Sequence, residues 1–135
     1  MFSLNKSERL CGKSSTTDLF LNGSSINDDS FRVIFLAQDY TRDVYFKGQV
    51  IVPKKHVSRA VDRNFIKRQM REALRKNKTM LIDFLQNTSK QLNFAIIYQI
   101  SEIKETSFIE EKIKSLIIRL IKKLWNRFYQ WFYCF

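Results

Sequence analysis

Three stretches of the chain have the apolar composition of β-strands. FRVIFLA (31–37) and VYFKGQVIV (44–52) are rich in β-branched and aromatic residues, which favour strands. FAIIYQI (94–100) is a continuous apolar run of strand length, a pattern typical of a strand buried on both faces. Gly48 predicts a bend in the second stretch, and Pro53, which lacks a backbone donor, marks its end.

A helical periodicity follows the second strand. Apolar residues recur there at i, i+4, i+7 and i+8 and define one face: Ile66, Met70, Ala73 and Leu74. The helix is expected to begin between Ser58 and Asp62, and either residue is a suitable N-cap. The segment MLIDFL (80–85) either prolongs this helix or forms another turn.

The last part of the chain predicts a second long helix. Ser107 and Glu110 form a capping box ahead of an apolar run. The apolar residues that follow have helical spacing: Ile109, Ile113, Leu116, Ile117, Leu120, Ile121, Leu124 and Phe128. This stripe indicates packing on a core.

The N-terminal region (4–23) predicts a short polar helix that ends at Asn22-Gly23. Its candidate core contacts are Leu10, Leu19 and Phe20, and SSINDDS (24–30) is predicted to be a loop. The element order is therefore α-β-β-α-β-α, an α/β fold of the α+β sandwich type, with helices packed on a small mixed sheet. Residues 54 to 92 must then cross one face of the sheet.

Size and composition support a globular protein. The 135 residues, of which 44% are hydrophobic, predict a single domain (1–135) with a core of about 4–128 and an aromatic extension, 129–135. The extension either continues the last helix and packs, stacks on RNA, or mediates association or membrane contact. Packing is favoured because Leu124, Phe128 and Trp131 continue the apolar stripe.

The charge of the chain is concentrated in one helix. Residues 54–78 contain ten Lys/Arg and two acids, and so supply +8 of the net charge of +11. Opposite the apolar face of the helix lies a polar and cationic stripe: Asn64, Lys67, Arg68, Arg71, Arg75 and Lys78. Like charges at this spacing repel one another, so the stripe predicts a polyanionic partner, and a phosphate backbone fits best.

Other features exclude several classes of protein. The N-terminal sequence has no continuous apolar stretch and no apolar run is long enough for a membrane span, so a cytoplasmic protein without a membrane partner is predicted. Cys11 and Cys134 are expected to be reduced thiols. A zinc site is not expected, because the cysteines lack CxxC spacing and His56 is the only histidine.

No autonomous active site is predicted. His56 lies within the basic segment and is interpreted as an ordinary polar or RNA-facing side chain. The acidic pairs Asp28-Asp29 and Glu110-Glu111 lie in a predicted loop and at a helix start, where solvation and the helix dipole explain them. Phosphate-binding glycine motifs are absent from the sequence.

The motifs resemble those of the protein subunit of bacterial ribonuclease P. The match consists of VPKK (52–55), AVDRN (60–64) and FIKRQMREALR (65–75). A second, less specific match covers an N-terminal LxKxxRL…LFxxG pattern: Leu4, Lys6, Arg9, Leu10, Leu19, Phe20 and Gly23. With the element order, the resemblance spans about residues 4 to 128.

The resemblance implies an RNA-binding protein that assists a catalytic RNA in endonucleolytic removal of the 5′ leader of precursor tRNA. Hydrolysis would be performed by that RNA with Mg²⁺ that the RNA mainly holds, and no protein ligands to the ion are expected. The strand-helix-strand crossover would be left-handed, against the usual rule. The implied partners are the catalytic RNA and precursor tRNA, and not DNA.

Site residues are carried over by position. The RNA-binding set consists of Lys54, Lys55, Arg59, Arg63, Asn64, Lys67, Arg68, Arg71 and Arg75. Phe20 and Phe31 are expected to line a cleft for the leader, since aromatic faces suit unstacked bases. Two positions depart from the family pattern. Phe65 stands where the family has an arginine, so one phosphate or stacking contact is expected to be lost or replaced. Thr16 stands where the family has an aromatic and cannot stack, so the leader is expected to be held more weakly or in a different place.

Three alternatives remain open. A ribosomal or structured-RNA-binding module would also carry a basic helix, without a role in processing. A DNA-reading helix should have a second helix a short turn away, whereas an apolar strand and a proline precede this one. The last helix combines its apolar stripe with five cations and could therefore lie on an anionic membrane: Lys112, Arg119, Lys122, Lys123 and Arg127. Packing of the stripe on the core, with the cations as a solvated basic edge, is favoured.

Overall fold

The computed structural model describes residues 13–39 and 45–133, with side-chain surroundings given for residues 17–37 and 45–127. The elements are α1 (Lys13–Asn22), β1 (Ser24–Asn27), β2 (Phe31–Asp39), β3 (Phe46–Ile51), α2 (Ala60–Thr88), β4 (Lys90–Tyr98) and α3 (Thr106–Tyr133). The predicted order is confirmed, with one addition. Residues 24–27, predicted to be part of a loop, form the short strand β1.

The sheet is mixed and has the strand order β1-β2-β4-β3. β1 pairs antiparallel with β2, and β2 pairs antiparallel with β4. β3 and β4 are parallel, with Gly48 opposite Phe94, so the chain between them crosses one face of the sheet as predicted. The left hand of this crossover stays a prediction.

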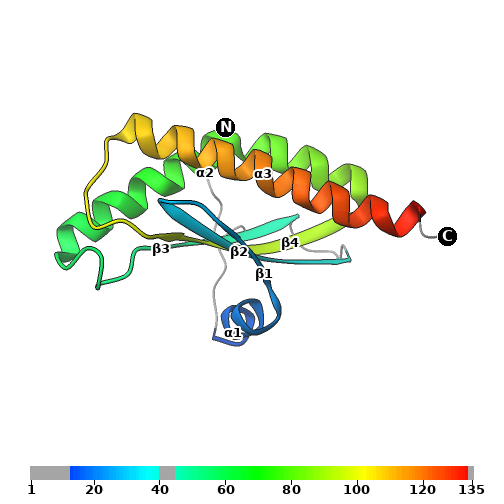
Figure 1. Ribbon diagram of the computed structural model, residues 1–135, viewed down its shortest axis with the longest axis horizontal. Coiled ribbons are helices and arrows are strands. Elements are labelled where there is room, and N and C mark those ends of the chain that lie inside the picture. The colour runs from blue at the N-terminus through cyan, green and yellow to red at the C-terminus, as the bar shows by residue number, and fades with distance from the viewer. Residues whose placement is uncertain (1–12, 40–44, 134–135) are drawn as a thin grey trace.

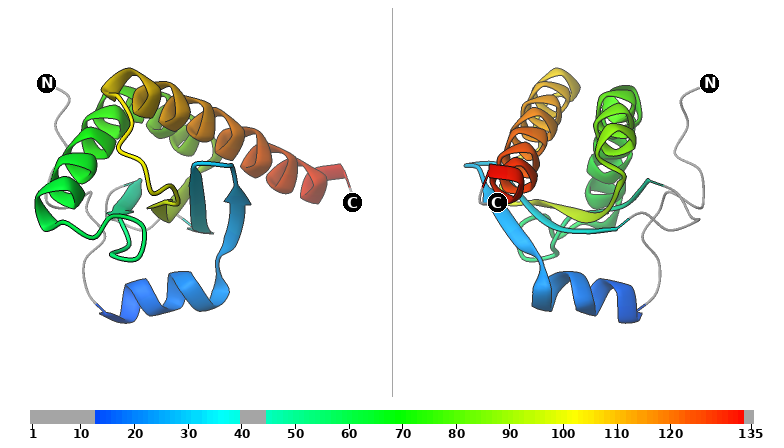
Figure 2. Two further views of the ribbon diagram at one scale, coloured as in Figure 1. Left: turned by 60° about the vertical axis from the view of Figure 1, so that its left-hand side comes forward. Right: turned by 90° about the vertical axis from the view of Figure 1, so that its right-hand side faces the viewer.

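The two faces of the sheet are covered differently (Figure 1). α2 and α3 lie side by side on one face, and α1 lies on the other (Figure 2). The main core between the sheet and the helix pair includes Phe35, Phe94 and Leu116. A smaller cluster of Leu19, Ile34 and Ala95 lies on the face covered by α1. The cationic α2 therefore has one side on the core and the other toward solvent.

α2 confirms the predicted apolar face, because Ile66, Met70, Ala73 and Leu74 are all buried. The helix continues through residues 80–85 and ends at Thr88, so that segment prolongs it. Lys78 is a correction: it is only 8% exposed, although it was predicted to belong to the cationic stripe. Its position at the margin of the apolar face, one turn after Leu74, explains its burial.

The two ends of α2 are set by its neighbours in sequence. The N-cap is Arg59, which makes no side-chain capping bond, so the prediction of Ser58 or Asp62 as the cap is wrong. Arg63 instead donates from Nη1 to the carbonyl oxygens of Val57 and Ser58, at 3.1 and 2.6 Å. At the other end Ser89 has a left-handed backbone, with φ 54°, and its N–H donates to the carbonyl of Gln86.

Two glycines allow close approaches. The N–H of Gly23 donates to the carbonyl of Leu19 at 2.9 Å, which ends α1 as predicted. A Cβ at position 23 would lie 2.4 Å from that oxygen. Gly48 lies within β3 next to the ring of Phe94, and a Cβ there would be 2.7 Å from Cζ of that ring. The glycine therefore makes room for Phe94, and the bend expected at Gly48 stays a prediction.

α3 packs through the predicted stripe, with Ile109, Ile113 and Leu120 buried. It begins at Thr106, so Ser107 lies inside its first turn and does not cap it. The helix runs to Tyr133, which confirms that most of the aromatic extension continues it. The side-chain surroundings of Phe128 and Trp131 lie outside the described residues, as do Leu10, Cys11 and Cys134.

Candidate nucleic-acid interface

The outward side of α2 presents the centre of the predicted RNA-binding set. Burial of Ile66 and Met70 turns Asn64, Arg68 and Arg71 to solvent, and all three are exposed. Neither Arg68 nor Arg71 makes an ion pair or hydrogen bond within the described part of the chain. Lys67, at the margin of this face, is half-buried. Two arginines about one turn apart can thus each contact a phosphate.

The turn before α2 adds two cations to this surface. The carbonyl of Pro53 accepts hydrogen bonds from the N–H groups of His56 and Val57, each at 3.1 Å. This turn leaves Lys54 and Lys55 exposed, shortly before the N-terminal end of α2. Because that end of a helix carries partial positive charge, lysines nearby are unfavourable alone and favour an anionic partner.

Three arginines of the predicted set already have partners within the chain. Arg63 bonds the carbonyls of Val57 and Ser58, so part of its donor capacity holds the start of α2. Nε of Arg59 lies 3.8 Å from Oδ2 of Asp62. Nε of Arg75 donates to Oε2 of Glu72 at 3.0 Å, and its Nη2 pairs with the other carboxylate oxygen. The sequence did not predict these contacts.

The pair of Arg75 and Glu72 is electrostatically self-consistent. The hydrogen bond from Arg75 lowers the pKa of the Glu72 carboxyl below its ordinary value. The same bond raises the pKa of the Arg75 guanidinium. Both groups are therefore charged at neutral pH, and this end of the cationic stripe is partly neutralised from within.

An apolar patch borders the cations near the start of α2. Val61 is 70% exposed and Phe65 is 44% exposed, one helical turn apart. Val61 was missed by sequence analysis, although its spacing from Phe65 is a usable signal. An exposed aromatic ring next to Arg68 is suited to stacking on an unpaired base.

The structure does not confirm the predicted leader cleft at Phe20 or Phe31, and it corrects the position of Phe31. Phe20 of α1 is exposed, next to the buried Leu19, so it is accessible to a ligand and is not the core contact first predicted. Phe31 is 0% exposed and packs edge-on against Tyr98, with ring centroids 5.5 Å apart. It faces the helix pair α2 and α3, because strand residues alternate between faces, and cannot line a cleft next to α1.

Two polar groups on the α1 side of the sheet were not predicted. Asn93 precedes Ala95 by two residues on β4, and Gln49 is paired with Ala95 across the ladder, so both share the face of Leu19. Oδ1 of Asn93 and Oε1 of Gln49 are buried without a hydrogen-bond partner among the described residues. An unpaired buried acceptor costs about 1–3 kcal/mol, so these two oxygens reduce the stability of this face.

The described residues contain no group of three or more His, Cys, Asp or Glu side chains that is suited to hold a metal ion. None of the helices in residues 13–39 and 45–133 is both long and apolar enough to cross a membrane. The apolar stripe of α3 lies in the core, so its cations form the solvated basic edge that was favoured over a membrane surface.

A family model and individual relatives point to the same protein family. The sequence model of the family described as Ribonuclease P matches residues 4–124. The chain is similar to the ribonuclease P protein component of Porphyromonas gingivalis, with 33% identity over 119 residues, covering 88% of this chain and 87% of the relative. It is also similar to that of Petrotoga mobilis, with 33% identity over 124 residues, covering 88% and 92%.

Solved structures agree at the level of fold. The RNase P protein of Staphylococcus aureus superimposes with a TM-score of 0.67 at 20% identity, covering 87% of this chain and 97% of that one. The RNase P protein of Thermotoga maritima gives a TM-score of 0.62 at 25% identity, covering 83% and 96%.

Proposed function

Because the chain belongs to the ribonuclease P protein family, we propose that it binds the catalytic RNA of ribonuclease P and assists removal of the 5′ leader from precursor tRNA. The observation that carries this proposal is the exposed pair Arg68 and Arg71, which have no partner within the described residues and lie opposite the buried stripe of α2. Their chemistry matches the phosphate backbone of a large RNA.

The charge around α2 supports binding of a polyanion. Lys54, Lys55, Arg68 and Arg71 are all exposed, and Asp62 and Glu72 are the only acids in residues 54–78. Asp62 lies near Arg59, and Glu72 bonds Arg75, so neither compensates these four cations. Their mutual repulsion is relieved by phosphates, which makes RNA binding the favoured role of this surface.

The face of the sheet covered by α1 is our candidate for the leader. Phe20 offers an exposed ring there, which is suited to stacking on an unpaired base. In this proposal, stacking on that ring holds single-stranded RNA with little demand on sequence. Phe31 has no part in it.

Hydrolysis of the phosphodiester bond is assigned to the RNA partner and its magnesium ions. The described residues contain no group of three or more side chains suited to hold a metal ion. In our proposal the protein performs no catalytic step. Its contribution is to position the leader and to neutralise phosphates, and a cytoplasmic location is part of this proposal.

A module of the ribosome or of another structured RNA is the second candidate, because the exposed stripe of α2 would suit it equally. The two functions differ in what the protein does to leader cleavage. A ribonuclease P protein restores cleavage of precursor tRNA by the ribonuclease P RNA at low magnesium. A ribosomal protein co-sediments with ribosomal subunits and leaves that cleavage unchanged.

The experiment is reconstitution with ribonuclease P RNA of the same organism and a precursor tRNA with a single-stranded leader. The full chain should stimulate cleavage at low magnesium, and Arg68→Ala should weaken the stimulation. Lys114→Ala is the matched control, because Lys114 is an exposed cation on α3 with no partner among the described residues. Absence of stimulation by the unmodified protein, together with co-sedimentation with ribosomal subunits, would overturn the proposal.

A further inference from the structure

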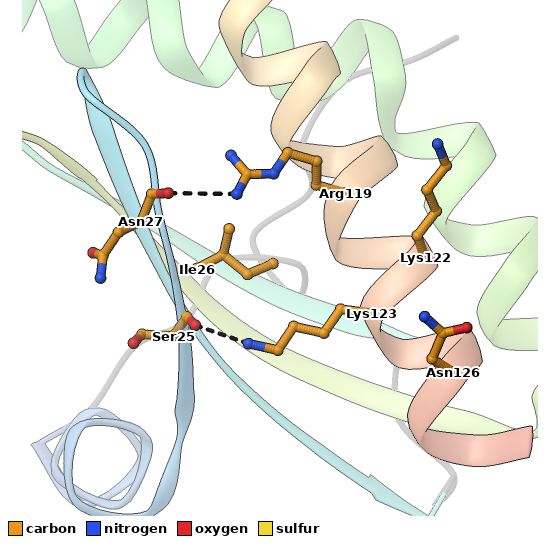
Figure 3. A pocket seen from close by; sticks show the side chains of 7 residues that line it. All are labelled: Ser25, Ile26, Asn27, Arg119, Lys122, Lys123 and Asn126. Atoms are coloured by element: carbon orange, nitrogen blue, oxygen red, sulfur yellow. Dashed lines mark hydrogen bonds between the residues drawn. The ribbon is translucent and has the colours of Figure 1, made fainter. Parts of the chain in front are cut away.

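A second cationic surface lies at the opposite edge of the sheet from β3. A hollow of about 420 Å³ opens there between β1 and α3, lined by Ser25, Ile26, Asn27, Arg119, Lys122, Lys123 and Asn126 (Figure 3). Three of these side chains are cations and none is acidic. The hollow is within the size range of small-ligand sites.

Hydrogen bonds to uncharged groups of β1 hold these cations in place. Nη2 of Arg119 donates to the carbonyl oxygen of Asn27 at 3.4 Å, and Nζ of Lys123 donates to that of Ser25 at 3.0 Å (Figure 3). One turn further on, Nη1 of Arg127 lies 3.2 Å from Oγ of Ser24. Carbonyl and hydroxyl oxygens orient these side chains but carry no formal charge, so the positive charge is not cancelled.

Among the residues that the structure describes, no acidic side chain pairs with Arg119, Lys122 or Lys123. Asp28 follows β1 directly, but its Oδ2 lies 3.4 Å from Nζ of Lys112, so this carboxylate pairs with Lys112. Arg119 and Lys123 are one helical turn apart, about 6 Å along the axis. Two cations at that spacing repel each other, and a bound anion removes the repulsion.

Anchoring of β1 explains only part of the cluster. It accounts for Arg119, Lys123 and Arg127, whose donors reach the strand. It does not account for Lys122 and Asn126, which are exposed on the α3 side of the hollow and make no ion pair or hydrogen bond within the described residues. An ammonium and an amide at the same opening supply further donors that suit a phosphate group.

We propose that this hollow binds a backbone phosphate of RNA as a second contact, separate from α2, with Lys122, Asn126 and the remaining donors of Arg119 and Lys123 as its ligands. The inference rests on the proposed function, because it takes RNA as the partner. Two strands separate β1 from β3, so the hollow lies at the edge of the sheet opposite to the strand that leads into Lys54, Lys55 and α2.

The test uses the full chain and two variants that leave the anchors of β1 intact. Lys122→Ala removes one cation, and Asn126→Asp adds an acid without removing a cation. Each should weaken RNA binding roughly two- to fivefold at moderate salt, and Lys122→Ala should reduce the log-log salt slope by about 1. Lys114→Ala is the matched control on the same helix, since Lys114 does not line the hollow.

Two arms distinguish the source of the phosphate. One measures affinity for ribonuclease P RNA alone, and the other measures affinity of the assembled holoenzyme for precursor tRNA. A loss in the first arm assigns the phosphate to the catalytic RNA, and a loss only in the second assigns it to the substrate. Either supports the inference, provided that thermal melting is unchanged.

The inference is overturned if both variants match Lys114→Ala in both arms, or if they lose affinity only for anionic phospholipid vesicles. Arg68→Ala, measured in parallel, separates this failure from a failure of the proposed function. A loss with Arg68→Ala and none with Lys122→Ala leaves the function standing without the second contact. If the unmodified protein does not bind ribonuclease P RNA, the proposed function and the inference fall together.

Discussion

Arg75 donates from Nε to Oε2 of Glu72, three residues earlier on α2, at 3.0 Å. The last arginine of the predicted RNA-binding set is thus held by an acid on its own helix. This pairing partly neutralises the C-terminal half of the cationic stripe on α2.

Glu72→Gln should therefore tighten binding to ribonuclease P RNA, because it removes a negative charge next to Arg75 and releases part of its donor capacity. We expect a gain of roughly two- to fivefold at low salt and a steeper salt dependence. Glu111→Gln is the control, since Glu111 is an exposed acid on α3 that pairs with nothing in the described residues. Equal gains from both variants would show that net charge alone matters.

Arg68→Ala and Arg71→Ala should each reduce the log-log salt slope of RNA binding by about 1. Their melting temperatures should be unchanged, because both side chains face away from Ile66 and Met70. Arg63→Ala should behave differently and lower the melting temperature, since it removes the bonds to Val57 and Ser58. Unaltered slopes in both Arg68 and Arg71 variants would contradict their placement at the RNA.

Phe65→Arg should tighten RNA binding by about 0.5–1.5 kcal/mol, the scale of one charge-assisted contact. Phe65 is 44% exposed, so folding should change little. Leu21→Arg, on the exposed side of α1, adds the same charge away from α2 and controls for long-range attraction. A lower melting temperature without a gain in affinity would mean that Phe65 is needed for packing. A calorimetric melt beside a binding titration separates the outcomes.

Gly48→Ala should destabilise the protein by about 1–3 kcal/mol, because the new methyl group would overlap the buried ring of Phe94. Urea unfolding measures the loss. Phe94→Leu should recover part of it in the double variant, since the smaller side chain vacates the space. Additive effects in the cycle would contradict a direct contact.

Ser89→Gly should stabilise the protein by about 0.5–1 kcal/mol, because glycine adopts the left-handed backbone of the α2 C-cap without strain. Thr88→Gly, one residue earlier and inside the helix, should have the opposite sign. It also removes the hydroxyl that donates to the carbonyl of Phe84. Changes of the same sign at both positions in thermal unfolding would refute the assignment.

The sequence predicted the elements whose periodicity reflects burial. The apolar face of α2 with Ile66 and Met70 was predictable because one side of the helix lies in the core. β4 was predictable because it is buried on both sides and is therefore a continuous apolar run. β1 was not predictable in this way. Only Ile26 of its four residues is buried, and its strand geometry comes from pairing with β2.

The candidate site was predicted less completely, because local contacts decide which cations are available. The composition of residues 54–78 gives their number, but it cannot show that Arg63 bonds the turn before it or that Arg75 pairs with Glu72. Phe31 was assigned to the wrong face of the sheet, because the sequence alone does not show which face the first residue of a strand lies on. Gln49 and Asn93 follow no sequence pattern, and only the pairing of β3 with β4 places them on the same face of the sheet.

The cations on α3 have a consequence for how copies of this protein meet. β1 is an outer strand, and an outer strand with open carbonyls is a template on which another chain can add its own strand. Arg119 and Lys123 already donate to the carbonyls of Asn27 and Ser25, and their charge repels an identical basic molecule. The same side chains therefore protect the protein from edge-to-edge aggregation.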